Sequence, residues 1–178
     1  MAVLKVARLG HPALRRIAEP VGREAVGTPE VQRLIDDMLE TMDEHDGAGL
    51  AAPQVCVSKR IVVYGCEANP RYPDAEQVPL TVLVDPRITP LTEEQDEDWE
   101  GCLSVPDLRG MVTRCARVRV DAVGRDGKKL RFEAGGFHAR VVLHECDHLD
   151  GIVFLDRMRS LETLSFVREL ARYGRALA

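Results

Sequence analysis

The sequence predicts an α+β fold in one domain spanning residues 1–178. Three observations predict it: apolar residues at helical spacing after residue 28, alternating apolar and polar residues between 112 and 134, and a mostly apolar helical pattern from 136 to 150. A chain of 178 residues is long enough to bury a substantial core.

The composition excludes several classes of protein. Hydrophobic residues make up 45% of the chain and charged residues 30%, and the formal net charge is −5, so DNA is not an expected partner. The segment Met1–Ile17 has short apolar runs between basic residues, so neither a secretory leader nor a membrane is expected. Five cysteines without a Cys-x-x-Cys pair are typical of reduced thiols, which favours the cytoplasm.

The first third of the chain is predicted to contain an irregular arm and one helix. Two prolines discourage a long helix in residues 10–20. Thr28 can cap a helix that begins with Pro29, and Gly47 can end it. The buried side of this helix is predicted to consist of Val31, Leu34, Ile35, Met38, Leu39 and Met42.

A run of small residues, 47–54, follows this helix. Its two glycines at alternate positions resemble half of a nucleotide-binding loop, but the further glycine and the preceding strand are missing, so a phosphate site is not expected. Small residues let another backbone approach closely, and Gln54 adds a side-chain amide that can donate to an oxygen.

The middle of the chain is predicted to form short strands. Residues 61–64 and 80–84 are rich in β-forming residues, whereas the acidic segment 93–100 is expected to be a solvated loop. Alternation from 112 to 123 indicates a half-buried strand. An Asp-Gly turn then leads into a returning strand that ends near residue 134.

The predicted buried helix carries the pattern His144-Glu145-Cys-Asp-His148. Residues i and i+4 lie on the same face of a helix, so both imidazoles can bind one metal ion. Glu145 then lies beside the ion and can accept a proton from water bound there. Phe137 and Val141 share the stripe of the two histidines, and buried histidines need partners. A metal-dependent hydrolase is therefore expected.

These residues leave the third metal ligand open. The metzincin pattern requires a histidine where this chain has Phe154, which excludes that class. A thermolysin-like site would use Glu162 or Glu169, although both are more simply explained as the solvated face of a helix. The upstream segment Glu-Gly-Cys-Leu-Ser offers Cys102 as a thiolate ligand.

The last predicted element is an amphipathic helix over about residues 160–177. Its basic residues, up to Arg175, leave open a contact with ribosomal RNA, although a solvated face is the simpler explanation. The residues predicted to face the core are Leu161, Leu164, Val167, Leu170 and Ala171.

Three separated segments, taken together, resemble the peptide deformylase family. They are Gly-Ala-Gly-Leu-Ala-Ala-Pro-Gln (47–54), Glu-Gly-Cys-Leu-Ser (100–104) and His-Glu-Cys-Asp-His (144–148), in the order of the family's three motifs. Gly10–Arg15 and Leu149–Arg157 extend the similarity over nearly the whole chain. The resemblance implies an enzyme that removes the formyl group from the N-terminal formyl-methionine of nascent polypeptides and releases formate.

The resemblance also implies a role for each site residue. Glu145 would be the general base and acid, and Gln54 and the backbone N–H of Leu103 would donate to the oxyanion. One divalent metal ion per chain is implied, Fe(II) in the cell with zinc, nickel or cobalt as substitutes. Its ligands would be Cys102, His144 and His148. The residues implied to bind substrate are Gly47, Gly49, Leu50, Glu100, Gly101, Arg109, Phe137 and Val141.

The family's fold is α+β, with short mixed or antiparallel β-sheets packed around a central buried helix that carries the His-Glu-x-x-His motif, plus N-terminal and C-terminal amphipathic helices. The implied partners are N-formyl-methionyl nascent peptides, with a ribosome contact left open, and the implied state is a cytoplasmic monomer. Three residues depart from the family's usual ones: Ala48, Asp107 and Leu143.

Two other classes of protein remain open. One is a zinc peptidase with a downstream glutamate as its third ligand, in which Cys102→Ala would leave metal binding largely intact. The other is a non-catalytic, peptide-binding relative that keeps the fold. The complete set of reactive residues argues against this second class, because a relative that has lost its catalytic activity has no physical reason to retain these residues.

Overall fold

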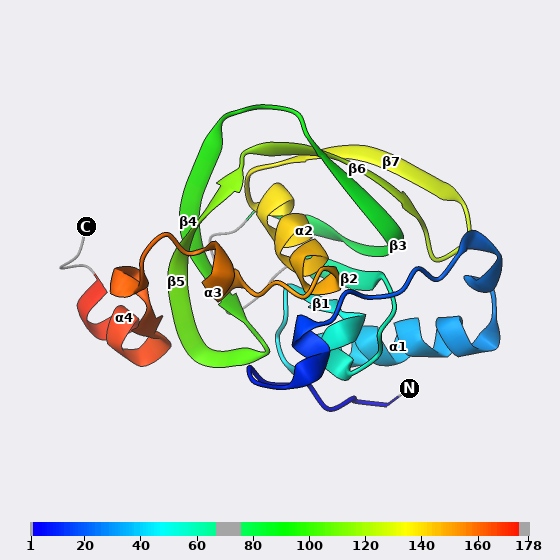
Figure 1. Cartoon of the computed structure of the whole chain (residues 1–178), viewed down its shortest axis with the longest axis horizontal. Helices are drawn as coiled ribbons and strands as arrows, with labels where there is room; N and C mark the ends of the chain where they lie inside the picture. The colour runs from blue at the N-terminus through cyan, green and yellow to red at the C-terminus, as the bar shows by residue number, and fades with distance from the viewer. Residues whose placement is uncertain (1, 67–75, 175–178) are drawn as a thin grey trace.

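The computed structural model describes residues 2–66 and 76–174, and it consists of two sheets arranged around one helix (Figure 1). That helix, α2 (Gly136–Leu149), lies in the middle of the view, with β4 and β5 on one side and β6 and β7 curving over it. The predicted α+β class is confirmed. Every pairing between the named strands of the described residues is antiparallel.

Helix α1 (Pro29–Glu44) confirms the first predicted helix. The hydroxyl of Thr28 caps it by accepting from the backbone N–H of Val31 at 3.5 Å. The helix does not need Gly47 as its terminator. Asp46 adopts the left-handed conformation instead, with φ of 49°, which a short polar residue tolerates.

A five-stranded sheet forms one layer of the molecule and places β1 at its edge. The predicted hairpin is confirmed, because β6 and β7 pair along their whole lengths. The predicted alternation in β6 also holds, since Val118 and Val120 are fully buried. In spatial order the strands are β1 (Gly49–Ala51), β2 (Ile61–Cys66), β3 (Val78–Pro90), β6 (Arg117–Val123) and β7 (Lys129–Gly135).

A second sheet corrects two predictions. It contains β4 (Gln95–Cys102), β5 (Val105–Cys115) and β8 (Ser165–Phe166), in that order. The acidic segment expected to be a loop is therefore mostly strand β4, whose first four residues are exposed and whose end is buried. The single strand predicted over 112–123 is two strands in different sheets, because the chain breaks at Ala116 and leaves one sheet for the other.

The predicted C-terminal helix is wrong in its extent. The segment is divided into a 3-10 turn (Leu161–Thr163), strand β8 and the short helix α4 (Val167–Tyr173). The pairing of β8 with β5 competes with helix formation for backbone hydrogen bonds. Leu161 and Val167, predicted to face the core, are 67% and 41% exposed. Residue 175, the last of the basic residues considered above, lies outside the described residues.

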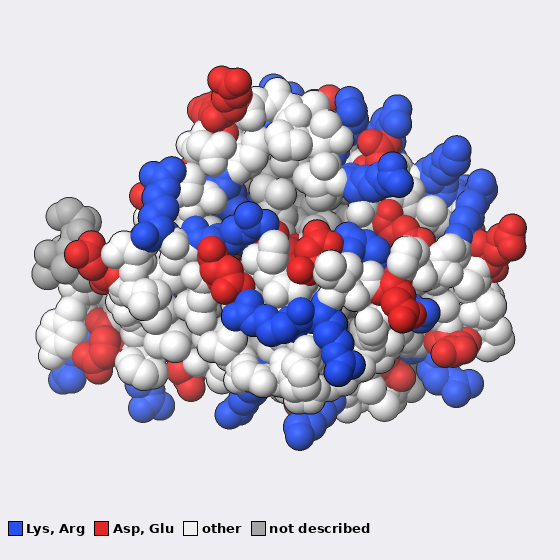
Figure 2. Space-filling view, viewed as in Figure 1, with Lys and Arg blue, Asp and Glu red and all other residues white. Residues whose placement is uncertain are grey.

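The surface around α4 carries charges of both signs. Figure 2 shows basic and acidic side chains intermixed at the end of the molecule where α4 lies. Arg168 and Arg172 on this helix are exposed, and so is Glu169 between them. The face therefore has the mixed charge of an ordinary solvated surface.

Helix α2 confirms the predicted buried helix. It starts directly after β7, where Gly136 adopts a φ of 52° that lets the chain turn from strand to helix. Ala139, Val142 and Leu149 are fully buried in a core shared with the five-stranded sheet. Although α2 is largely apolar, neither it nor another helix of residues 2–66 and 76–174 is both long and apolar enough to cross a membrane.

Candidate metal centre

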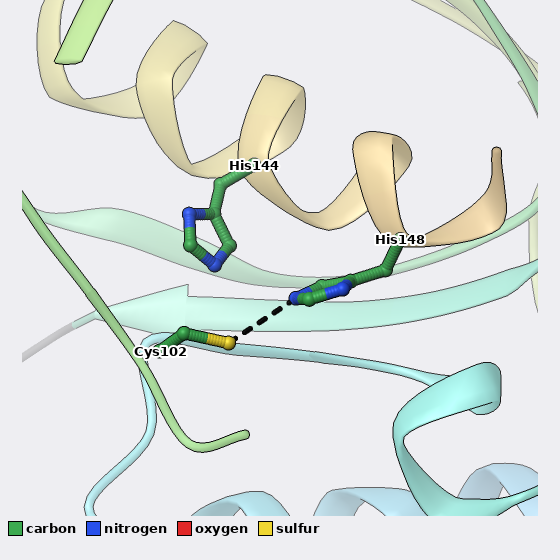
Figure 3. A group of neighbouring side chains, drawn as sticks. All are labelled: Cys102, His144 and His148. Atoms are coloured by element: carbon green, nitrogen blue, oxygen red, sulfur yellow. Dashed lines mark hydrogen bonds between the residues drawn. The ribbon is translucent and has the colours of Figure 1, made fainter. Parts of the chain in front are cut away.

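Cys102, His144 and His148 meet between the two sheets. Cys102 is the last residue of β4, and the two histidines lie one turn apart on α2, with their side chains directed at one another (Figure 3). One ligand atom from each lies within 4.8 Å of the others, and all three residues are buried. Sγ of Cys102 is 3.3 Å from Nε2 of His148.

The downstream glutamates are not part of this group. Glu162 and Glu169 are both exposed, on the C-terminal segment that follows α3 (Phe154–Arg157). Within residues 2–66 and 76–174, the cysteine and the two histidines form the only such group of three potential ligands. The geometry therefore favours the thiolate as the third ligand over a downstream carboxylate.

Glu100 determines which nitrogen of His144 faces the site. Its Oε2 lies 2.8 Å from Nδ1 of His144. Burial alone would raise the pKa of Glu100, but hydrogen bonds from Arg114 and His144 hold it well below its usual range. An ionised carboxylate only accepts, so Nδ1 carries the proton and Nε2 is left able to bind a metal ion, the arrangement that orients histidine ligands in metal sites.

A buried group of charged residues supports Glu100. Arg114 donates to both of its oxygens, from Nε at 2.8 Å and from Nη2 at 2.9 Å. Arg114 also donates to Asp147 at 2.5 Å, and Asp147 receives two further hydrogen bonds from Arg157. Arg140 donates to Glu100 at 3.0 Å. His144 is thus linked to the surface through alternating charges.

Sequence analysis did not identify these supporting residues. A signal was present, because Arg140 and Asp147 lie on a helix predicted to be buried on nearly all sides, where a charge needs a partner. Arg114 gave a similar signal, because in the predicted alternation it is in phase with Val118 and Val120 on the buried side of the strand. Glu100, predicted to lie in a solvated loop, is buried at the end of a strand and lies against His144 of the candidate metal centre.

The environment of Cys102 favours the thiolate that metals bind. Burial would raise the pKa of this thiol, but the neighbouring imidazoles of His148 and His144 hold it well below its usual range. Two N–H groups point at the sulfur, Nε2 of Gln54 and the backbone N–H of Ser104, each at 3.4 Å. A buried thiolate with two imidazoles is a donor set that fits a divalent transition-metal ion.

Glu145 lies beside this group and has a free oxygen. It is 5% exposed, and within the described residues its Oε2 has no hydrogen-bond partner. Its carboxylate packs on Gly49, where a side-chain carbon would lie 2.6 Å from Cδ of Glu145, so a larger residue at this position would displace the carboxylate. Burial, opposed in part by His144 and His148, raises the pKa of Glu145 to about 7. This carboxylate can therefore both accept and return a proton near neutral pH.

A pocket opens over these residues. Six of the eight residues predicted to bind substrate line it; Leu50 and Arg109 do not. Leu50 is fully buried with α1 in a separate core, and Arg109 lies opposite Gly101 in the pairing of β5 with β4. The lining residues are Gly47, Ala48, Gly49, Gln54, Trp99, Glu100, Gly101, Cys102, Leu103, Phe137, Arg140, Val141, His144 and Glu145.

Comparison with known proteins gives the family. Residues 3–164 match the family model described as polypeptide deformylase. The chain belongs to the polypeptide deformylase family. Members of this family are metal-dependent enzymes that remove formyl groups, so the predicted enzyme class is confirmed.

Individual deformylases are similar over most of their length. The chain is 49% identical to peptide deformylase 1 of Nitrosomonas europaea and 48% identical to that of Bordetella pertussis, in each case over 93% of both chains. A structure of the class I type b deformylase of Acinetobacter baumannii with Met-Ala-Ser bound has a TM-score of 0.85 and 43% identity, and covers 88% of this chain and 99% of that one. The Thermotoga maritima deformylase has a TM-score of 0.79 at 31% identity, covering 90% and 100% of the two chains.

One departure from the usual deformylase residues has a structural explanation. Asp107, one of the three residues that depart from the family resemblance, adopts a φ of 64° in the left-handed region that glycine favours. Aspartate is among the few other residues that tolerate this conformation. The backbone path after Cys102 is therefore compatible with either residue.

We expect Glu100→Gln to lower the free energy of unfolding by about 3–5 kcal/mol at pH 7, because the buried guanidinium groups of Arg114 and Arg140 each lose a charged partner. The pKa of Glu100 is lower in the folded state than in the unfolded state. Its contribution is therefore complete above the unfolded value of about 4.3 and is lost as the pH falls through the folded value.

Urea unfolding of both proteins between pH 3 and pH 8 measures this contribution. The difference in unfolding free energy between the native protein and Glu100→Gln should be constant above about pH 5.5 and should decrease below about pH 4.3. Glu133→Gln, which breaks an exposed ion pair with Arg117, is the control and should have a much smaller effect. A difference that grows on acidification would contradict the assignment of Glu100 as an ionised buried acceptor.

Proposed function

We propose that this chain removes the formyl group from N-formyl-methionyl peptides, with residues 1–178 acting as one catalytic domain. The observation that carries the proposal is the buried oxygen of Glu145, which has no partner among the described residues and lies beside a cluster of three side chains that could hold a metal ion. A base placed in this way beside a metal is the arrangement of a hydrolase.

The proposed ligands of one divalent ion are Sγ of Cys102, Nε2 of His144 and Nε2 of His148, and the ion in the cell is proposed to be Fe(II). Zinc, nickel or cobalt can replace it, because thiolate and imidazole serve several of these ions. A bound ion supplies a Lewis acid that polarises water and the formyl oxygen.

Glu145 is proposed to move the proton that the reaction requires. Its carboxylate accepts a proton from the water that attacks the formyl carbon, then delivers this proton to the departing amine. A pKa of about 7 supports both steps, because a group that titrates near the working pH is efficient as base and as acid.

Gln54 and the backbone N–H of Leu103 are proposed to stabilise the oxyanion. Oε1 of Gln54 accepts from the backbone N–H of Ala51 at 2.8 Å, which fixes the orientation of the side-chain amide. Nε2 then points toward Sγ of Cys102, so it lies beside the proposed metal position. A donor held in place before the reaction stabilises developing charge without a cost of reorganisation.

We expect Gln54→Leu to lower kcat by about 100- to 1,000-fold at full metal occupancy, as for other losses of an oxyanion donor. Ser104→Ala is the matched control. It removes the second acceptor of the same amide, the hydroxyl at 3.1 Å, but leaves the donor in place, so its kcat should stay close to that of the native protein. Equal losses in the two variants would contradict the proposed role.

The pocket is suited to one apolar side chain followed by an extended backbone. Phe137, Val141 and Trp99 give it an apolar lining that fits methionine. Strands β1 and β4 each lie at the edge of a sheet, and both contribute backbone to the pocket. An extended peptide can pair with such edges whatever its sequence, which suits a substrate as varied as nascent chains.

The test is the products formed from formyl-Met-Ala-Ser by protein prepared without oxygen. We expect formate and Met-Ala-Ser in equal amounts, with the Met–Ala bond intact by mass spectrometry. Unformylated Met-Ala-Ser should remain unchanged. Cleavage of a peptide bond in either peptide would instead support the zinc peptidase alternative.

A further inference from the structure

We propose that Arg140 is a positioning residue: it holds β4 against α2 and thereby fixes the third metal ligand relative to the other two. Arg140 lies on α2 one turn before His144 and is 4% exposed. Since α2 carries both histidines and β4 carries Cys102, the ligand set is assembled only if these two elements keep a fixed separation.

The guanidinium of Arg140 binds the backbone of the second sheet. Nη1 donates to the carbonyl of Val112 at 2.8 Å and more weakly to that of Asp98 at 3.4 Å, and Nη2 donates to the carbonyl of Asp96 at 2.9 Å. The carboxylate of Glu100 receives a further hydrogen bond from Nη1. One planar group on α2 is thus bonded to both β4 and β5.

Strand β4 needs such a tie because it lies at the edge of its sheet. Among the described strands its only neighbour is β5, and their pairing fixes β4 along that sheet but not its separation from α2. The hydrogen bond between Glu100 and His144 joins side chains only. The backbone of β4 is held directly by Arg140, six and four residues before Cys102.

The charges of Glu100 and Asp147 do not require Arg140 for their neutralisation. Arg114 already donates to both oxygens of Glu100, and Asp147 is paired with both Arg114 and Arg157. Arg114 and Arg157 therefore balance the charges of Glu100 and Asp147 without Arg140, whose own further ion pair is a longer one, 3.5 Å, with the exposed carboxylate of Asp96. The backbone acceptors of Arg140 indicate a geometric role instead.

The same tie limits the width of the pocket. Arg140 itself lines the pocket, together with Trp99 on β4 and with Phe137 and Val141 on α2. If β4 moves away from α2, the pocket widens. On the proposed function, the expected consequence is weaker discrimination between methionine and smaller side chains at the first residue of the formyl-peptide.

Cobalt(II) titration of the metal-free protein tests the proposal without activity. The variants are Arg140→Met, which removes all donors, and Arg140→Lys, which keeps the charge but cannot reach several acceptors at once. Arg117→Met is the control, because it makes the same change at an exposed ion pair. Absorption by the cobalt–thiolate bond reports binding, and circular dichroism shows that each variant is folded.

We expect cobalt to bind about 10- to 100-fold more weakly to Arg140→Met, the range typical of residues that support metal ligands. Arg140→Lys should be intermediate and Arg117→Met unchanged. A folded Arg140→Met with native cobalt affinity would overturn the proposal. If Arg140→Met does not fold, the cobalt affinity of Arg140→Lys tests the proposal instead. Native cobalt affinity in Arg140→Lys would then overturn the proposal.

A second measurement compares kcat/KM for formyl-Met-Ala-Ser and formyl-Ala-Ala-Ser at saturating cobalt. The ratio should fall in Arg140→Met and stay constant in Arg117→Met, whereas a merely structural role would leave the ratio unchanged. This measurement rests on the proposed function. If the native protein releases no formate, that function fails, and the cobalt titration still decides the role of Arg140.

Discussion

Glu145→Gln is expected to bind a metal ion as tightly as the native protein and to release formate about 100- to 10,000-fold more slowly, the usual contribution of a general base and acid. Glutamine has nearly the same shape as glutamate and cannot accept a proton. Because Glu145 lies outside the three-ligand group, metal content should not change.

The measurement is formate release at saturating substrate, with metal content determined on the same samples. Glu162→Gln is the matched control: Glu162 is exposed and is a proposed ligand only in the peptidase alternative. It should behave as the native protein. Native activity in Glu145→Gln would show that Glu145 takes no part in the reaction. Loss of metal from this variant would show that Glu145 is a metal ligand rather than a base.

Cys102→Ala is expected to lose the metal ion, and with it all formate release. The thiolate is the only negatively charged group among the three ligands, and its pKa is held well below the usual value by the two imidazoles. Its removal leaves two neutral imidazoles on one helix, a weaker site for a divalent ion than three ligands that include a charged thiolate.

Cys146→Ala is the matched control for this variant. Cys146 is also buried and lies on α2 between the two histidines, but it is not one of the three ligands, and burial raises the pKa of its thiol. Metal content by elemental analysis should be near zero in Cys102→Ala and unchanged in Cys146→Ala. Retention of metal by Cys102→Ala would favour the alternative with a downstream glutamate.

The sequence was most informative where one physical signal dominated. Helical spacing placed α1 and α2 nearly to the residue, and the i, i+4 histidines on a buried helix indicated a metal site. The two-residue alternation of β6 and the Asp-Gly turn predicted its hairpin with β7. In each case a local pattern was sufficient.

Prediction failed where the deciding contacts are distant in the sequence. Strand β4 was not predicted, because its exposed acidic residues resemble those of a loop, although its last residue, Cys102, is buried in the core. Choosing Cys102 as the third ligand therefore required the family resemblance. The partners of Arg114 could not be predicted, because Glu100 and Asp147 are 14 and 33 residues away.

The prediction of one long C-terminal helix was wrong for a related reason. Its apolar residues have helical spacing, but two residues, Ser165 and Phe166, pair with β5 and interrupt the helix. Periodicity describes which residues share a face, and it does not show whether a neighbouring strand offers better backbone hydrogen bonds.

The central claim is that one metal ion held by Cys102, His144 and His148 is required for deformylation. Its most direct test is formate release by metal-free protein to which Fe(II) is added stepwise without oxygen. Activity should be absent at first, rise in proportion to bound metal and reach a plateau at one equivalent. Formate release by the metal-free protein, or none after one equivalent has bound, would contradict the claim.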